Sequence, residues 1–184
     1  MSGFVDLHCH WLPGIDDGAR DSEESKAMLR ELRAVGFSHI AATPHMRPDL
    51  WDNTQSAICA AFERRNTWLN DKHPTPELFL GCEHFFDATV LERIARHQAV
   101  PFGKVPANSG DSANEFGKTL LVEFADLSPL SIIEEQLFRI GQAGYFVVIA
   151  HPERYQSVWK NRAGLERLLS LGHATLLDVA ALDG

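Results

Sequence analysis

Several side chains that can bind a divalent metal ion stand at the carboxyl ends of short apolar segments in this sequence. His8 and His10 end the first of these segments, FVDLHCH. Four later segments finish in the same way, on His45, Glu83, Glu123 and His151. In a barrel of alternating strands and helices, the carboxyl ends of the strands meet on one face, where the active site lies. The pattern predicts a hydrolase that holds several metal ions at the mouth of such a barrel.

The two histidines of HCH point to the same side of an extended segment, because side chains alternate along a strand. Paired imidazoles suit a borderline divalent ion such as manganese, iron or zinc. An isolated pair of histidines is more often structurally neutral. The additional candidates at equivalent strand ends are what favour a metal site here.

Glu83 and Glu123 have apolar flanks that predict partial burial. An unpaired buried carboxylate is costly, so each needs a partner. One alternative is an arginine such as Arg154. We favour a metal ion, because histidine ligands need charge-balancing oxygen ligands and one carboxylate can bridge two ions.

Asp16 and Asp17 lie in a turn, PGIDDGA, directly after the paired histidines. Asp-Asp-Gly is an ordinary turn sequence. The functional alternative is that one of the two orients a ligand histidine, and Asp17 is our candidate catalytic carboxylate.

Arg154, in AHPERY, is predicted to hold phosphate oxygens in a bidentate fork beside the metals. The alternative for Arg154 is a surface ion pair with Glu153.

The cysteines offer a competing chemistry that the sequence does not support. Cys59 and Arg65 have the C-x5-R spacing of cysteine-dependent phosphatases, which need a loop whose backbone N–H groups hold phosphate. The intervening AAFER has no glycine and continues a helical pattern, so we attribute the spacing to chance. Cys9 has no evident base to activate it. The remaining histidines are expected in solvent or at helix caps: His39, His73, His84, His97 and His173.

Apolar segments alternate with amphipathic helical segments along the chain. Consecutive apolar residues are typical of parallel strands that are buried on both faces. The predicted strands are residues 3–8, 38–43, 77–82, 119–124, 146–150 and 174–179. The predicted helices run from the cap Asp21 to Gly36, over 52–69, from Pro129 onward, and over 162–171. Residues 100–118, rich in Gly, Pro, Asn and Ser, predict a surface loop.

The composition is that of one globular domain, which we assign to residues 1–184. The chain is 45% hydrophobic and carries a formal net charge of -8. It has no basic stripe, which argues against nucleic acid or an acidic membrane surface as a partner. The three cysteines form no CxxC pair, and the sequence shows neither a signal peptide nor a membrane span, so we expect a cytoplasmic protein.

Taken together, the segments DLHCHWLPGIDDGARDSEES, ATPH, GCEHFFD, LLVEF and AHPERY resemble the polymerase-and-histidinol-phosphatase (PHP) superfamily. The resemblance is strongest to its bacterial manganese-dependent protein-tyrosine phosphatases of capsule and exopolysaccharide loci. It implies a distorted TIM-like (β/α)7 barrel with up to three metal ions, held by the six candidates named first. It also implies a phosphate contact by Arg154, and a substrate that is a tyrosine kinase phosphorylated in its tail.

The resemblance also implies a last strand with an Asp-x-His ligand pair. The sequence has no such pair after the strand predicted at 174–179, so we expect a domain without its last strand and helix, with weak stability and fewer than three metal ions. Two functional alternatives stay open. One is a PHP phosphoesterase of a small ester such as histidinol phosphate, and the other is an inactive, truncated PHP domain. The sequence leaves the oligomeric state undetermined.

Overall fold

The computed structural model describes residues 3–69, 75–103, 115–159 and 161–182. Every pair of neighbouring strands in it runs parallel. The described strands are β1 (Phe4–Cys9), β2 (Phe37–Ala42), β3 (His45–Met46), β4 (Glu77–Leu80), β5 (Glu83–Phe85), β6 (Thr119–Glu123), β7 (Phe146–Ala150) and β8 (Ala174–Leu176). The α-helices are α1 (Ser22–Ala34), α2 (Gln55–Arg64), α3 (Ala88–Ala95), α4 (Leu130–Gln142), α5 (Gln156–Trp159) and α6 (Arg162–Ser170). The predicted α/β class with parallel strands is confirmed.

The helix boundaries follow local capping chemistry. The side chain of Asp21 accepts hydrogen bonds from the backbone N–H groups of Glu23 and Glu24, and so caps α1 as its sequence predicts. Thr54 caps α2 in the same way, and therefore the helix predicted from residue 52 begins later. Pro129 is the N-cap residue of α4 and not its first helical residue.

The described strands form two sheets rather than one continuous sheet. One sheet has the order β1-β2-β4 and the other β3-β5-β6-β7-β8. Backbone hydrogen bonds from Gly81 to Ala42 and from Glu83 to Pro44 connect the pair β2–β4 to the pair β3–β5. The strand predicted over 77–82 ends at Leu80, and β5 begins at Glu83. Gly81 allows a close approach, since a Cβ there would lie 2.6 Å from the ring of Phe102. Among the described residues no closed barrel is formed.

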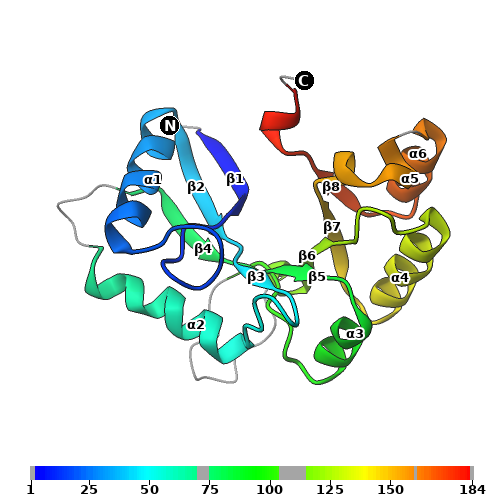
Figure 1. The fold of residues 1–184 in the computed structure, drawn as a ribbon, viewed down its shortest axis with the longest axis horizontal. Coiled ribbons are helices and arrows are strands. Elements are labelled where there is room, and N and C mark those ends of the chain that lie inside the picture. Colours follow the sequence, from blue (N-terminus) through cyan, green and yellow to red (C-terminus); the bar gives the residue numbers. More distant parts are fainter. Residues whose placement is uncertain (1–2, 70–74, 104–114, 160, 183–184) are drawn as a thin grey trace.

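Both faces of the central strands are buried, as their unbroken apolar runs predict. Leu120 and Val122 of β6 belong to a core cluster beneath the helices that includes Ile133 of α4. The intervening Leu121 belongs to a second cluster, on the opposite face, with Val148 of β7. Helices therefore lie outside the strands, α1 and α2 over one sheet and α3 to α6 over the other (Figure 1). The edge strands β1 and β8 stand apart on opposite sides of the view.

Two further expectations concern segments at the limits of the described chain. Most of the surface loop predicted at 100–118 lies outside the described residues, which resume with a short 3-10 helix at Glu115–Lys118. His73 also lies outside them. None of the described helices combines the length and the apolar character that crossing a bilayer requires.

Candidate metal centre

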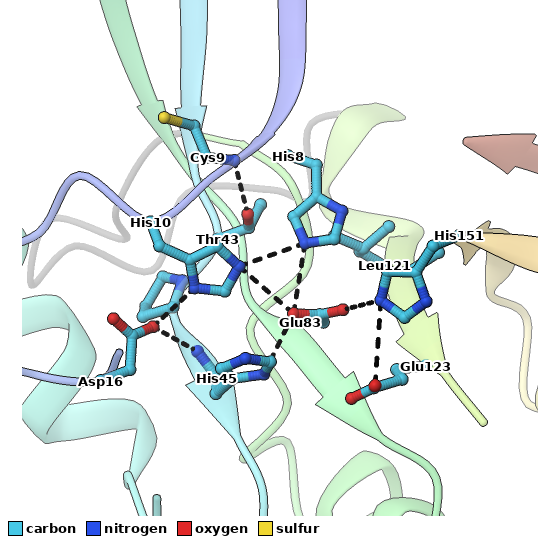
Figure 2. A network of polar contacts seen from close by, with 12 residues as sticks. His8, Cys9, His10, Asp16, Thr43, His45, Glu83, Leu121, Glu123 and His151 are labelled. Carbon is cyan, nitrogen blue, oxygen red and sulfur yellow. Dashed lines mark hydrogen bonds and ion pairs between the residues drawn. The ribbon is translucent and has the colours of Figure 1, made fainter. Parts of the chain in front are cut away.

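The carboxylate of Glu83 is the centre of the site, and four histidine side chains surround it (Figure 2). Its Oε2 atom lies 3.2 Å from Nε2 of His8, 3.3 Å from Nε2 of His10 and 3.0 Å from Nδ1 of His45. Its Oε1 atom lies 2.7 Å from Nε2 of His151. The side chain of Glu83 is only 1% exposed. The structure thus brings together five candidates. His8 and His10 lie at the end of β1, His45 and Glu83 begin the short strands β3 and β5, and His151 directly follows β7.

Glu123, the sixth predicted ligand, lies at the edge of this cluster. Its Oε1 atom is 3.8 Å from Nε2 of His151, and its Oε2 atom is buried without a hydrogen bond. Burial raises the pKa of this carboxyl group, and the nearby negative charge of Glu83 raises it further. The guanidinium group of Arg47 lies 3.9 Å from this oxygen, too far for a hydrogen bond, and a metal cation would satisfy it.

The electrostatics of the cluster arise from protons shared between imidazoles and carboxylates. Burial alone would raise the pKa of Glu83, but hydrogen bonds from His10, His151 and His8 outweigh it and lower that pKa. Burial alone would lower the pKa of His10, but Asp16 and Glu83 outweigh it and raise that pKa to about 10. Metal binding releases such protons, because only neutral imidazoles and ionised carboxylates are ligands.

The donor atoms present fit divalent metal ions. Three groups of side chains each offer ligand atoms within 4.8 Å of one another: His8, Glu83 and His151; His10, Asp17 and His45; and His45, Glu83 and Glu123. Mixed imidazole and carboxylate donors suit manganese, iron or zinc. Nδ1 of His151 and Oε2 of Glu123 are buried without hydrogen bonds. The site therefore has both the donor chemistry and the unsatisfied polar atoms that a metal centre requires.

Of the two adjacent aspartates, Asp16 is the one that orients a candidate ligand. Its Oδ2 atom lies 2.7 Å from Nδ1 of His10 and accepts a hydrogen bond from the backbone N–H of His45 at 2.9 Å. Its Oδ1 atom accepts one from the backbone N–H of Gly18. This arrangement leaves Nε2 of His10 directed at Glu83, which is the usual role of a carboxylate behind a metal-binding histidine.

Asp17 and Arg154 lie at the mouth of the site. Asp17 is 55% exposed, and its Oδ1 atom is 3.5 Å from Nε2 of His45. Arg154 is half exposed and pairs with Asp178 at 3.2 Å. The ion pair with Glu153 that the sequence left as an alternative is absent among the described residues, because Glu153 accepts a hydrogen bond from the backbone N–H of Asp178.

A pocket of about 640 Å³ opens onto this site. Its polar end is formed by the histidines, Glu83, Asp17 and Arg154. Its other walls come from β1, α1, β2 and the segment after β8. They mix apolar side chains, such as Val5, Leu32, Phe37 and Leu177, with the carboxylates of Asp6 and Asp178. The pocket therefore combines a metal-binding end with partly apolar walls.

Sequence reasoning missed two side chains on the loop after β3. Arg47 lies 3.9 Å from Oε2 of Glu123, and its guanidinium group sits 4.0 Å from the centroid of the Phe85 ring. The indole of Trp51 stacks on the imidazole of His45, with ring centroids 4.4 Å apart. The sequence offered one signal for Arg47, its position two residues after His45. Residues that directly follow a candidate ligand at a strand end are expected at the same edge of the sheet.

The cysteines lie outside this chemistry, as predicted. Cys59 lies within α2 and Arg65 directly follows that helix, so the segment between them forms no phosphate-binding loop. Cys9 is buried, which raises the pKa of its thiol to about 12, and the charge of Asp6 adds to the shift. A thiol held in its protonated form is a poor nucleophile.

The prediction that His84 lies in solvent or at a helix cap is wrong, because its side chain is fully buried.

Comparison with known proteins identifies the family. The family described as capsular polysaccharide synthesis, CpsB/CapC, matches residues 4–184. The chain belongs to the CpsB/CapC family. Among curated members, tyrosine-protein phosphatase YwqE of Bacillus subtilis (strain 168) is 30% identical over 181 residues, which cover 98% of the chain. Tyrosine-protein phosphatase CpsB of Streptococcus pneumoniae is 26% identical over 175 residues, which cover 95% of the chain.

Solved structures of CpsB/CapC proteins agree with this assignment. The present chain superposes on one solved structure with a TM-score of 0.80. That structure is described as belonging to the crystal structures of YwqE from Bacillus subtilis and CpsB from Streptococcus pneumoniae, unique metal-dependent tyrosine phosphatases. The two chains are 29% identical over 95% of this chain and 66% of that one. The present chain spans about two thirds of the length of these relatives (66% of YwqE and 67% of CpsB). Membership confirms the predicted resemblance to capsule-locus tyrosine phosphatases.

Proposed function

We propose that this CpsB/CapC-family chain hydrolyses phosphotyrosine in proteins with bound divalent metal ions. The observation that carries the proposal is the Glu83 carboxylate, which lies within 3.3 Å of four imidazole nitrogens at the end of a pocket. The names of the relatives, metal-dependent tyrosine phosphatases among them, support the same chemistry. The family description supports a substrate that acts in capsule or exopolysaccharide synthesis, and we propose a phosphorylated tyrosine kinase.

The proposed metal ligands are the six strand-end residues of the cluster: His8, His10, His45, Glu83, Glu123 and His151. We propose manganese, with iron and zinc as the other ions that suit this donor set. Bound metals would supply a water of lowered pKa as nucleophile and would polarise the phosphoryl oxygens. The remaining groups of the chain bind and orient the substrate.

Arg154 and Asp17 are the proposed catalytic residues at the pocket mouth. Arg154 exchanges its ion pair with Asp178 for two phosphate oxygens, and its planar fork stabilises the charge that develops on them. Asp17 adds a carboxylate oxygen to the donors of His10 and His45. No covalent intermediate is needed, and the buried Cys9 takes no part.

The lining of the pocket suits an aromatic phosphate ester. Phosphotyrosine has a charged phosphate and a flat apolar ring, and the pocket has a metal-binding end and apolar side chains that include Phe37 and Leu177. Asp6 and Asp178 also line the pocket and offer carboxylates to a cationic ester such as histidinol phosphate, so the measured substrate preference decides between the two. The apolar side chains of the pocket support phosphotyrosine as the proposed substrate class.

We further propose that the strands belong to the distorted (β/α)7 barrel of the PHP superfamily. The inner cluster of Ala41, Leu121 and Val148 supports this, because it lies on the strand face opposite the cluster packed against the helices, as a barrel core does. The three free cysteines are compatible with a cytoplasmic location.

Substrate comparison tests the proposed function. The chain, saturated with manganese, should hydrolyse a phosphotyrosine peptide faster than the matched phosphoserine peptide or histidinol phosphate. Arg154→Lys should raise KM for the phosphotyrosine peptide about tenfold, because a lysine cannot form the bidentate contact. Arg162→Lys, at an exposed helical ion pair, is the control and should match wild type. Faster hydrolysis of histidinol phosphate would overturn the substrate assignment.

A further inference from the structure

The hydroxyl group of Tyr155 joins the ends of the two strands that carry Glu123 and His151. It accepts a hydrogen bond from the backbone N–H of Phe124 at 3.0 Å and donates one to the backbone carbonyl of Ala150 at 2.7 Å. Phe124 directly follows Glu123, and Ala150 directly precedes His151. One hydroxyl therefore ties together the backbone beside two candidate metal ligands from different strands.

The backbone at His151 needs such support. Its φ of 32° and ψ of 57° lie in the left-handed region, which a residue with a side chain rarely adopts. This turn takes the chain out of β7 and leaves the imidazole 2.7 Å from Glu83. Backbone strain of this kind persists only where surrounding contacts over-determine it, and it concentrates at functional sites. The backbone N–H of His151, bonded to the carbonyl of Leu176, supplies one restraint, and Tyr155 supplies another.

The ring of Tyr155 is fixed by packing as firmly as its hydroxyl is fixed by hydrogen bonds. The side chain is fully buried. Its ring packs edge-on against Phe124 at 6.2 Å and against the imidazole of His151 at 6.2 Å. A rigid ring with two hydrogen-bonded backbone partners transmits the position of one strand end to the other.

We propose that Tyr155 is a positioning residue of the metal centre. Its hydroxyl sets the spacing of Glu123 and His151, so that both donors converge with Glu83. The proposal rests on the metal centre of the proposed function. It assigns a role to the tyrosine of AHPERY, which takes no part in the chemistry described above.

The test compares the two tyrosines of the chain, each changed to phenylalanine. Tyr155→Phe keeps the ring and removes only the hydroxyl that joins the strands. Tyr145→Phe removes the other tyrosine hydroxyl, from a partly buried ring packed on the same core cluster, and is the matched control. The metal-free proteins are titrated with Mn²⁺ by calorimetry and with Co²⁺ by visible absorption, whose bands report the coordination geometry.

Tyr155→Phe should bind Mn²⁺ about tenfold more weakly and change the Co²⁺ absorption bands, as variants of groups that orient metal ligands do. Tyr145→Phe should match wild type in both. Unchanged affinity and bands in Tyr155→Phe would overturn the positioning role while leaving the proposed function intact. Loss of the folded circular-dichroism spectrum in metal-free Tyr155→Phe would also overturn it, because the hydroxyl would then serve the whole fold. If wild type binds neither ion, the proposed metal centre itself is wrong.

Discussion

Asp16→Asn removes one oxygen from a carboxylate that uses both of its oxygens. The Oδ2 atom of Asp16 contacts Nδ1 of His10 and the backbone N–H of His45, whereas its Oδ1 atom accepts from Gly18. An asparagine has a single acceptor oxygen, so its amide N–H₂ must face an N–H donor on one side. The preferred rotamer keeps the oxygen on His10 and gives up the bond to Gly18.

Two magnitudes follow from this geometry. The bond from a neutral amide to His10 is weaker than the bond from a carboxylate, and loss of a group that orients a metal-binding histidine lowers metal affinity about 10- to 100-fold. Loss of a hydrogen bond to a charged group costs about 1.5–3 kcal/mol. At about 2–4 °C per kcal/mol for a chain of this size, the unfolding midpoint of the metal-free protein should fall by about 3–12 °C.

Calorimetric titration with Mn²⁺ and phosphotyrosine turnover measure these effects. Because Asp16 acts through His10 and is not itself a ligand, excess Mn²⁺ should restore much of the turnover of Asp16→Asn. Asp126→Asn, at an exposed position, makes the same charge change and should match wild type. Wild-type Mn²⁺ affinity in Asp16→Asn would refute the orienting role of Asp16.

Three further substitutions probe other parts of the site. Glu83→Gln should abolish both metal binding and turnover, even at high Mn²⁺, and a variant that retains metal would remove Glu83 from the centre. Cys59→Ser should keep wild-type turnover, since Cys59 lies on a helix; a folded but inactive variant would restore the cysteine mechanism. Gly18→Ala should lower stability by about 1–3 kcal/mol, because its Cβ would overlap the carbonyl oxygen of His10. Gly117→Ala, where a Cβ meets nothing within 4 Å, is its control in thermal unfolding.

The sequence predicted where donors would gather, because that depends on local pattern. An apolar run that ends on His45 or His151 fixes which residue stands at a strand end, and parallel pairing then brings those ends to one edge. The cap at Asp21 was predictable for the same reason, since its partners lie within the next turn. Pairing between distant strands then determines only which of these strand ends become neighbours in space.

Features that depend on packing between distant parts of the chain could not be predicted from the sequence. Asp16 and Asp17 have identical side chains in one turn, and only the path of that turn past His45 decides which of them is buried behind His10. The close approach of Gly81 to Phe102 also joins residues that lie 21 positions apart. The burial of His84 likewise follows from bonds to the carbonyl of Leu121 and the N–H of Val100, which lie far along the chain.

The proposed function requires that metal held by the cluster around Glu83 drive the turnover of phosphotyrosine. The most direct measurement is the metal content and phosphotyrosine turnover of one sample before chelation, after chelation and after addition of manganese. We predict that turnover disappears with the metal and returns in proportion to the manganese bound. Full turnover in excess chelator, after complete metal removal has been verified, would contradict the claim.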